Sequence, residues 1–137
     1  MTGEFNIAVH GLVFLGHKEC TVSSEELAEN ICTNPARVRK IMAKLKKYGL
    51  VETKEGKNGG YVLNKAPEHI NLEQILDAVQ VEPVEVSWRS GDQNMDCMVA
   101  SGMAYAMDRI YGELNKTCRK KLKAVSVRQV EEMLSLS

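Results

Sequence analysis

The sequence lacks the features of membrane proteins and of exported proteins. No segment approaches the ~18 consecutive apolar residues that cross a bilayer. The N-terminus is acidic at its start and has no small-residue cleavage site, unlike a secretion signal. With 44% hydrophobic and 26% charged residues among 137, the chain is neither disordered nor a disulfide-framework mini-protein. We therefore expect a cytoplasmic protein of one domain, or one domain with an appended helix, and no membrane partner.

The sequence also lacks the short motifs that mark catalytic and metal sites. It contains no nucleophile elbow, phosphate loop or paired catalytic carboxylates. The glycine-rich run at 56–60 lies between two β-like runs and does not open a helix. The three His residues show no metal-ligand pairing, and the four Cys residues form no Cys-x-x-Cys pair. We predict neither an enzyme nor a protein with a metal site or another cofactor.

The formal net charge of zero argues at first against a nucleic-acid partner, but the charges are unevenly distributed. Residues 34–65 hold nine basic and two acidic residues, for a net charge of +7, whereas residues 66–115 carry −7. Residues 1–33 and 116–137 carry −4 and +4. Because local potential rather than total charge attracts polyanions, the 34–65 block is a candidate contact for nucleic acid. A charge run alone is more often a solvated face, so its meaning depends on the elements that carry it.

Apolar spacing and capping residues predict three helices before the end of the basic block. Residues 5–16 have the pattern of a buried helix. A second helix follows the capping box Ser23–Glu26, in which a Ser hydroxyl accepts an early backbone N–H and the Glu26 side chain reaches back. The third begins with Asn34 as N-cap and Pro35 at the first helical position. Its apolar face consists of Val38, Ile41, Met42 and Leu45.

A β-hairpin is predicted directly after the third helix. Two short β-like runs, at 51–54 and 61–64, flank Asn58-Gly59, a pair that supplies the positive φ angles of a tight turn. Three helices followed by a glycine-turned hairpin are typical of a winged helix-turn-helix. We therefore predict a mainly α fold with a small β-hairpin wing.

The remainder of the chain is predicted to form a linker and a long helix. Asn71 and Gln74 form a capping box that opens a further helix, and breakers mark a linker at 80–95. A helical pattern of some 25 residues runs from Asp96 to about Lys123, which is long for a domain of this size and indicates a partner helix. A last capping box at 126–129 opens a short helix. We divide the chain into a winged helix-turn-helix DNA-binding domain (1–80), a linker or sensing loop (81–95), and a dimerisation helix with a short C-terminal helix (96–137).

The third predicted helix lies where a recognition helix enters the major groove of DNA. Its basic side chains can neutralise phosphates, and its first turn points side chains at base edges. A Ser at a helix N-terminus can bind phosphate, and the wing can reach the neighbouring backbone. The predicted DNA-binding residues are Ser23, Ser24, Asn34, Pro35, Ala36, Arg37, Arg39, Lys40, Lys44, Lys54, Lys57, Asn58, Gly59 and Tyr61.

Four segments match a known sequence pattern: Ser24–Glu29, Leu45–Val51, Gly56–Leu63 and Ile70–Ile75. Through them the chain resembles the Rrf-two family of bacterial winged helix-turn-helix transcription regulators. The resemblance implies a homodimer, paired through the long helix, that binds double-stranded operator DNA with half-sites about 34 Å apart. We expect a repressor that an oxidant, electrophile or small metabolite releases. The family's wing usually carries an Arg before its first Gly, where this chain has Glu55, so Lys57 is the candidate substitute.

The cysteines are the candidate input for a signal. Cluster-binding members of the family carry Cys-x5-Cys-x7-Cys in the linker, whereas this chain has only Cys97 there, and one thiolate cannot hold an iron–sulfur cluster. If Asp96 caps the long helix, Cys97 occupies its first position, where the helix dipole favours a thiolate. Cys32 lies in the turn before the recognition helix. We hypothesise that Cys97 reacts with an oxidant or with Cys32 of the other subunit; the alternative is that both are small buried hydrophobic residues.

The apolar stripe of the long helix predicts the dimer interface. Its residues are Val99, Met103, Ala106, Met107, Ile110 and Leu114. Two other functions remain open from the sequence: a regulator that senses a metabolite or a metal or iron–sulfur centre, and a winged-helix protein-interaction module that does not bind DNA.

Overall fold

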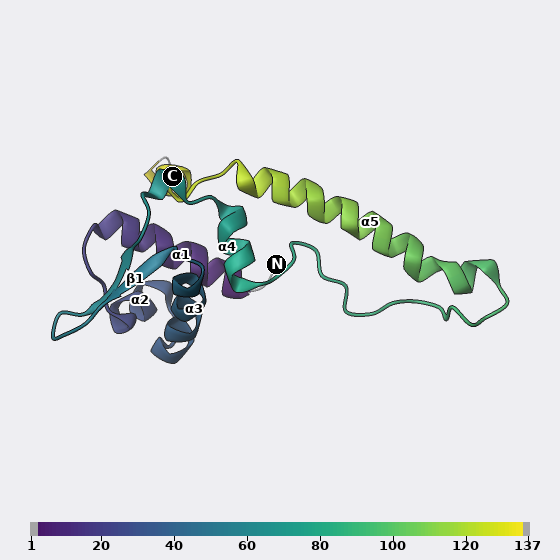
Figure 1. Ribbon diagram of the computed structural model, residues 1–137, viewed down its shortest axis with the longest axis horizontal. Helices are drawn as coiled ribbons and strands as arrows, with labels where there is room; N and C mark the ends of the chain where they lie inside the picture. Colours follow the sequence, from purple (N-terminus) through teal and green to yellow (C-terminus); the bar gives the residue numbers. More distant parts are fainter. Residues whose placement is uncertain (1–2, 136–137) are drawn as a thin grey trace.

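A computed structural model describes residues 3–135 of the chain, in which one long helix projects from a body of shorter helices and a hairpin (Figure 1). The elements are α1 (Gly3–Lys18), α2 (Ser24–Ile31), α3 (Pro35–Lys47), β1 (Val51–Lys54), β2 (Gly60–Leu63), the 3-10 helix η1 (Pro67–His69), α4 (Leu72–Val79), α5 (Met98–Lys123) and α6 (Val127–Ser135). The predicted fold class, mainly α with a small β-hairpin, is confirmed. In the described residues no helix is long and apolar enough to cross a membrane.

The two helices of the helix-turn-helix begin at the predicted caps. The Asn34 side chain accepts a hydrogen bond from the backbone N–H of Arg37 at 2.8 Å, and Pro35 occupies the first turn. The Ser23 hydroxyl oxygen accepts from the backbone N–H of Glu26 at 3.1 Å. The predicted return bond is replaced, because the Glu26 carboxylate lies 3.7 Å from Lys18 Nζ on α1. Half of this capping box is therefore confirmed.

Both later capping boxes are complete. Asn71 accepts from the Gln74 backbone N–H at 2.9 Å, while the Gln74 side chain accepts from Asn71 N–H at 3.0 Å. Ser126 and Gln129 make the same pair of bonds at 3.1 and 2.8 Å. These reciprocal bonds satisfy N–H groups that the first turn of a helix leaves unpaired. Four consecutive residues are therefore enough to predict where each of the helices α4 and α6 begins.

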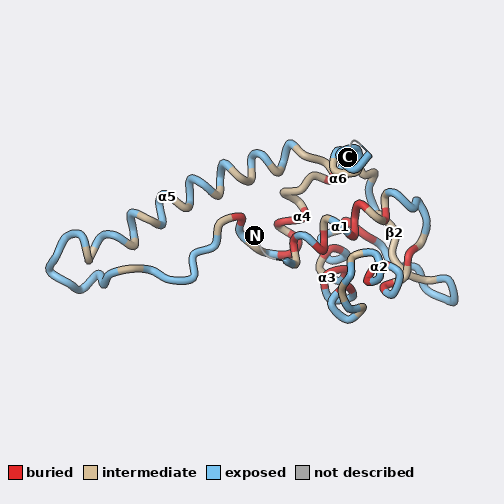
Figure 2. Tube along the Cα trace, turned by 180° about the vertical axis from the view of Figure 1, so that it is seen from behind, coloured by how far each residue is buried: buried red, intermediate tan, exposed pale blue. Residues whose placement is uncertain are grey.

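One hydrophobic core holds the body together. It lies among α1, α2, α3 and α4, and the buried segments in Figure 2 are concentrated there. The short helix α6, predicted in one region with the long helix, returns to this body. Val127 is 1% exposed and belongs to the same core, and Glu131 Oε2 lies 3.1 Å from His17 Nδ1 on α1.

The wing pairs β1 with β2 in antiparallel register, from Val51 opposite Leu63 to Lys54 opposite Gly60. The predicted turn geometry is wrong in detail. The positive φ falls on Gly56, at 102°, and not on Asn58-Gly59. Gly59 N–H donates to the carbonyl of Gly56 at 3.0 Å, and a Cβ on Gly59 would lie 2.3 Å from the Lys54 carbonyl oxygen. Glycine is required at position 59 because of this close approach, while Gly56 provides the left-handed backbone.

The long helix α5 has 26 residues, and none of them is buried (Figure 2). It starts one residue later than predicted, because Cys97 and not Asp96 is the N-cap. The linker runs alongside it and is fastened by Asn115, whose side chain accepts from Val84 N–H at 2.7 Å and donates to the Val84 carbonyl at 3.2 Å. Because a helix normally buries one face, a helix without buried residues indicates that another molecule covers part of its surface.

Gly60→Ala tests how closely the wing contacts the body. The backbones of Val22 and Tyr61 exchange hydrogen bonds at 3.0 and 2.8 Å, so a Cβ on Gly60 would lie 2.3 Å from the Val22 carbonyl oxygen. We expect the free energy of unfolding in urea to fall by about 2 kcal/mol. The control is Gly112→Ala on α5, where no neighbouring atom lies within 4 Å and alanine should stabilise by up to about 1 kcal/mol. Equal effects of the two substitutions would contradict the close contact.

Candidate nucleic-acid interface

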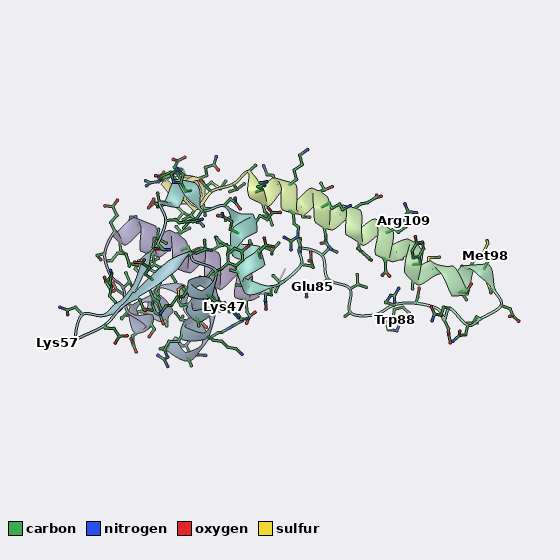
Figure 3. All side chains as sticks on the ribbon, viewed as in Figure 1. Lys47, Lys57, Glu85, Trp88, Met98 and Arg109 are labelled. Atoms are coloured by element: carbon green, nitrogen blue, oxygen red, sulfur yellow. The ribbon has the colours of Figure 1, made fainter. Side chains whose placement is uncertain are left out.

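The recognition-helix candidate α3 is anchored by one face and open on the other. Val38, Ile41, Met42 and Leu45 are all 0% exposed in the core, as predicted. The opposite side of the helix exposes Ala36, Arg37, Arg39, Lys40, Ala43, Lys46 and Lys47. In Figure 3 the labelled Lys47 lies on α3 and the labelled Lys57 at the tip of the wing. The helix α3 and the wing therefore provide two separate basic surfaces.

A polar cluster lies between α2, α3 and the wing. Arg39 Nη1 donates to the Ser24 hydroxyl at 3.2 Å and lies 3.7 Å from Glu25 Oε1, and the Ser24 hydroxyl donates to Glu25 Oε2 at 3.2 Å. Burial raises the pKa of Tyr61 on β2. The positive charge of Arg39 acts to lower this pKa, and the negative charge of Glu25 acts to raise it. Ser24 is only 8% exposed. Three predicted DNA contacts, Ser24, Arg39 and Tyr61, therefore meet in one cluster between the elements.

Two other lysines of α3 are also engaged within the protein. Lys44 Nζ lies 3.4 Å from Glu4 Oε2 on α1, with both side chains about one-third exposed, so a phosphate contact by Lys44 would compete with this ion pair. Lys46 Nζ donates to Thr53 Oγ1 on β1 at 2.9 Å. Sequence reasoning did not single out Lys46, because its partner is formed only when the wing folds back on α3. Together these contacts hold α3 from both sides.

Five basic side chains remain available to a ligand. We call the surface that they form the open basic face. It consists of Arg37, Lys40, Lys47, Lys54 and Lys57, all exposed and, within residues 3–135, all without an ion pair. Asn34, Pro35 and Ala36 stand at the start of α3 beside Arg37, and Asn58 and Gly59 at the wing tip beside Lys57. Unpaired cations on a helix and an adjacent hairpin can neutralise phosphates along a duplex while the helix contacts base edges.

The cysteines do not gather into one site. Cys97 is exposed at the N-cap of α5, where the backbone N–H groups of Ala100 and Val99 lower the pKa of its thiol. Cys32 is also exposed and is the C-cap of α2, with a left-handed backbone. Because α2 lies in the body and the start of α5 at the far end of the molecule, the two thiols of one chain are far apart (Figure 1). Neither is the buried hydrophobic residue of the alternative interpretation.

An unpartnered apolar stripe runs along α5. Val99, Met103, Ile110 and Leu114 are 58%, 38%, 49% and 45% exposed. Ala106 is exposed among them and Met107 is partly buried. The neighbouring face of α5 is occupied by the chain's own linker, to which Asn115 is bonded. All six predicted interface residues therefore lie on the long helix, and five of them are open to solvent.

A basic helix presented by a helix-turn-helix, with a basic hairpin beside it, defines a winged-helix DNA-binding protein of the transcription-regulator class. The family model described as "Rrf2: Iron-dependent Transcriptional regulator" matches residues 1–132. The chain belongs to the Rrf2 family, and the resemblance seen in the sequence is confirmed.

Individual relatives agree with this assignment. The HTH-type transcriptional regulator YwnA of Bacillus subtilis strain 168 is 29% identical over 124 residues, covering 90% of this chain and 91% of YwnA. The HTH-type transcriptional regulator NsrR of Bacillus licheniformis is 29% identical over 96 residues, 69% of this chain and 67% of NsrR. A crystal structure of a transcriptional regulator from Lactobacillus plantarum matches with a TM-score of 0.82 and 25% identity, covering 98% of this chain and 91% of that one.

The description of the family names iron, but the side chains of a single chain do not form a site for an iron centre. Among residues 3–135, no three His, Cys, Asp or Glu side chains lie close enough together to hold a metal ion. The linker and the start of α5 together provide one thiol, that of Cys97, and cluster ligation requires several. An iron centre would therefore need donors from a second chain.

Lys40→Ala tests whether the open basic face contacts DNA. Removing one phosphate-neutralising cation should weaken binding to duplex DNA and reduce the slope of log K against log salt by about 1. Fluorescence anisotropy across a potassium chloride series measures both. The matched control is Lys116→Ala, an exposed lysine of α5 outside this face. Equal losses in the two variants would show that total charge, and not the α3 surface, governs binding.

Proposed function

We propose that this regulator is a homodimeric repressor that reads a two-fold symmetric operator with α3 and the wing of each subunit. The observation that carries the proposal is the open basic face, which five exposed cations form around α3 and the hairpin. Arg37, in the first turn of α3, is placed to read a base, since a guanidinium can bond two acceptors of guanine. Lys54, Lys57 and Asn58 would contact the backbone next to the major groove.

The stripe on α5 supports pairing through that helix. Its apolar residues are arranged symmetrically about a point between Ala106 and Met107, so that an antiparallel copy would place Val99 opposite Leu114 and Met103 opposite Ile110. A two-fold interface needs such a self-complementary pattern. The small Ala106 at the centre would let the two helices approach closely. Burial of these side chains against a second copy would stabilise the dimer by removing apolar surface from water.

Ile110→Glu tests the proposed dimer. Ile110 is 49% exposed in the single chain, so a charge there should leave the fold intact while it disrupts the apolar seam. We expect a monomer in light scattering coupled to size exclusion, and loss of operator affinity of at least about tenfold. Tyr105→Glu, at a residue that is 66% exposed but lies off the stripe, should remain a dimer. A monomeric unmodified protein, or a dimeric Ile110→Glu, would contradict this interface.

We further propose that Cys97 receives an oxidant signal. Its exposed thiol has a lowered pKa, and the thiolate is the reactive form. With a peroxide as oxidant, the thiolate sulfur bonds one peroxide oxygen and hydroxide leaves, which gives a sulfenic acid. The thiol of Cys32 in the partner subunit then displaces water and forms a disulfide, so two thiols lose two electrons to one peroxide. The far separation of these residues within one chain favours a bond between subunits.

Cys97→Ser tests this signal. Peroxide should give a disulfide-linked dimer on a non-reducing gel and lower operator affinity for the unmodified protein, and neither change for Cys97→Ser. Cys118→Ser, on the partly buried side of α5, should respond like the unmodified protein. Unchanged affinity of the unmodified protein after peroxide would favour a metabolite effector, and a coloured, iron-containing protein from anaerobic purification would favour a metal centre shared between subunits. DNA affinity that is insensitive to salt would instead favour a protein-interaction module.

A further inference from the structure

One arginine joins α5 to the body. Arg119 Nη1 lies 2.6 Å from Asp77 Oδ1 and 3.9 Å from Glu73 Oε2, both on α4, and Nη2 lies 3.3 Å from Glu82 Oε1 in the linker. The hydrogen bond that Arg119 donates to the Asp77 carboxylate is the main reason that the pKa of Arg119 is raised. One guanidinium therefore binds three carboxylates from two segments. Its side chain is 25% exposed, which makes this a partly buried, charge-assisted cluster.

The same cluster continues to the recognition helix. Asp77 uses its first oxygen for Arg119, and its second, Oδ2, accepts from the Tyr48 hydroxyl at 3.5 Å, a long contact. Tyr48 is the C-cap of α3. Two side-chain contacts thus connect the end of α3 to α5, through a residue of α4 that sits between them.

Apolar packing does little to fix the direction of α5. No residue of this helix is buried, and Leu122 is the member of α5 that packs against the core. Polar contacts add to this attachment. The Arg119 cluster joins α5 to α4, and the Asn115–Val84 pair and the Arg89–Asp108 ion pair join it to the linker. Just beyond the end of α5, the Val125 carbonyl accepts from the Leu72 N–H at 2.9 Å. Directional bonds from a planar guanidinium set an angle more closely than a single apolar contact does.

We propose that Arg119 is a positioning residue for DNA recognition, which fixes the angle between α5 and α3 and thereby the separation of the two recognition helices. The inference rests on the proposed homodimer. Arg119 lies about 19 Å along the helix from the symmetric point of the stripe, at 1.5 Å per residue. A change in this angle would swing each DNA-reading body about the joint at Arg119 and so change the distance between the two recognition helices. Because one base pair rises by about 3.4 Å, a shift of that size already changes the preferred half-site spacing, which is the property to measure.

The test compares spacing preference among variants of the full chain. An operator is first selected from random duplexes with the unmodified protein, and one or two base pairs are then inserted or deleted between its half-sites. We expect Arg119→Met to lose about tenfold in affinity at the selected spacing and to bind the altered spacings within about twofold of it, while remaining dimeric. Arg119→Lys retains the charge and should recover part of the preference. Arg109→Met, the control, removes an exposed arginine of α5 (labelled in Figure 3) that has no ion pair within residues 3–135 and should keep the full preference.

The outcomes separate the inference from the function on which it rests. Asp77→Asn and Glu82→Gln are second variants, which weaken the same cluster without removing a long side chain, and should flatten the spacing profile in the same direction. An unmodified protein that selects no duplex overturns the proposed function. An unmodified protein that selects an operator, with spacing profiles unchanged in Arg119→Met and Asp77→Asn, overturns this inference alone. A loss of affinity equal at every spacing also overturns it, because it would show a general structural role.

Discussion

Burial of one face of α3 is the constraint on which the rest of the structure depends. Val38, Ile41, Met42 and Leu45 are fully removed from solvent, and each such side chain contributes about 1.5–3 kcal/mol. Because that face is fixed in the core, Arg37 and Lys40 have to project outward. The Asn34 cap sets where the helix begins, and the Arg39–Ser24–Glu25 contacts link it to α2. The basic surface is therefore a consequence of how the apolar residues pack.

The long helix α5 is held in place differently from the helices of the body. It contributes little to the core, exposes an apolar stripe, and is attached mainly through polar contacts at Asn115 and Arg119. The zero net charge reflects this division. The basic block 34–65 is α3 with the wing, and the acidic block 66–115 is α4, the linker and most of α5. The linker and α5 carry much of the acidic block away from the basic face (Figure 1), so neutrality of the whole chain does not oppose a DNA contact by one end of it.

Local signals predicted most of the fold, and contacts between distant residues could not be predicted. Asn34-Pro35, the two complete capping boxes and the stripe of α3 each depend on a few neighbouring residues, and the structure confirms them. The Ser24–Arg39 bond spans 15 positions and the Arg119–Asp77 bond spans 42, so no spacing rule reveals them. The cap at Cys97 and the left-handed Gly56 were missed because neighbouring Asp96 and Asn58-Gly59 carry the stronger statistical signals.

Hydroxyl-radical footprinting of the reduced protein on its selected sequence shows directly whether two α3 helices, joined through α5, read successive turns of one face of a duplex. If they do, the protected patches are related by two-fold symmetry and lie one helical turn, about 34 Å, apart. A single protected patch, or uniform protection without symmetry, would contradict that arrangement.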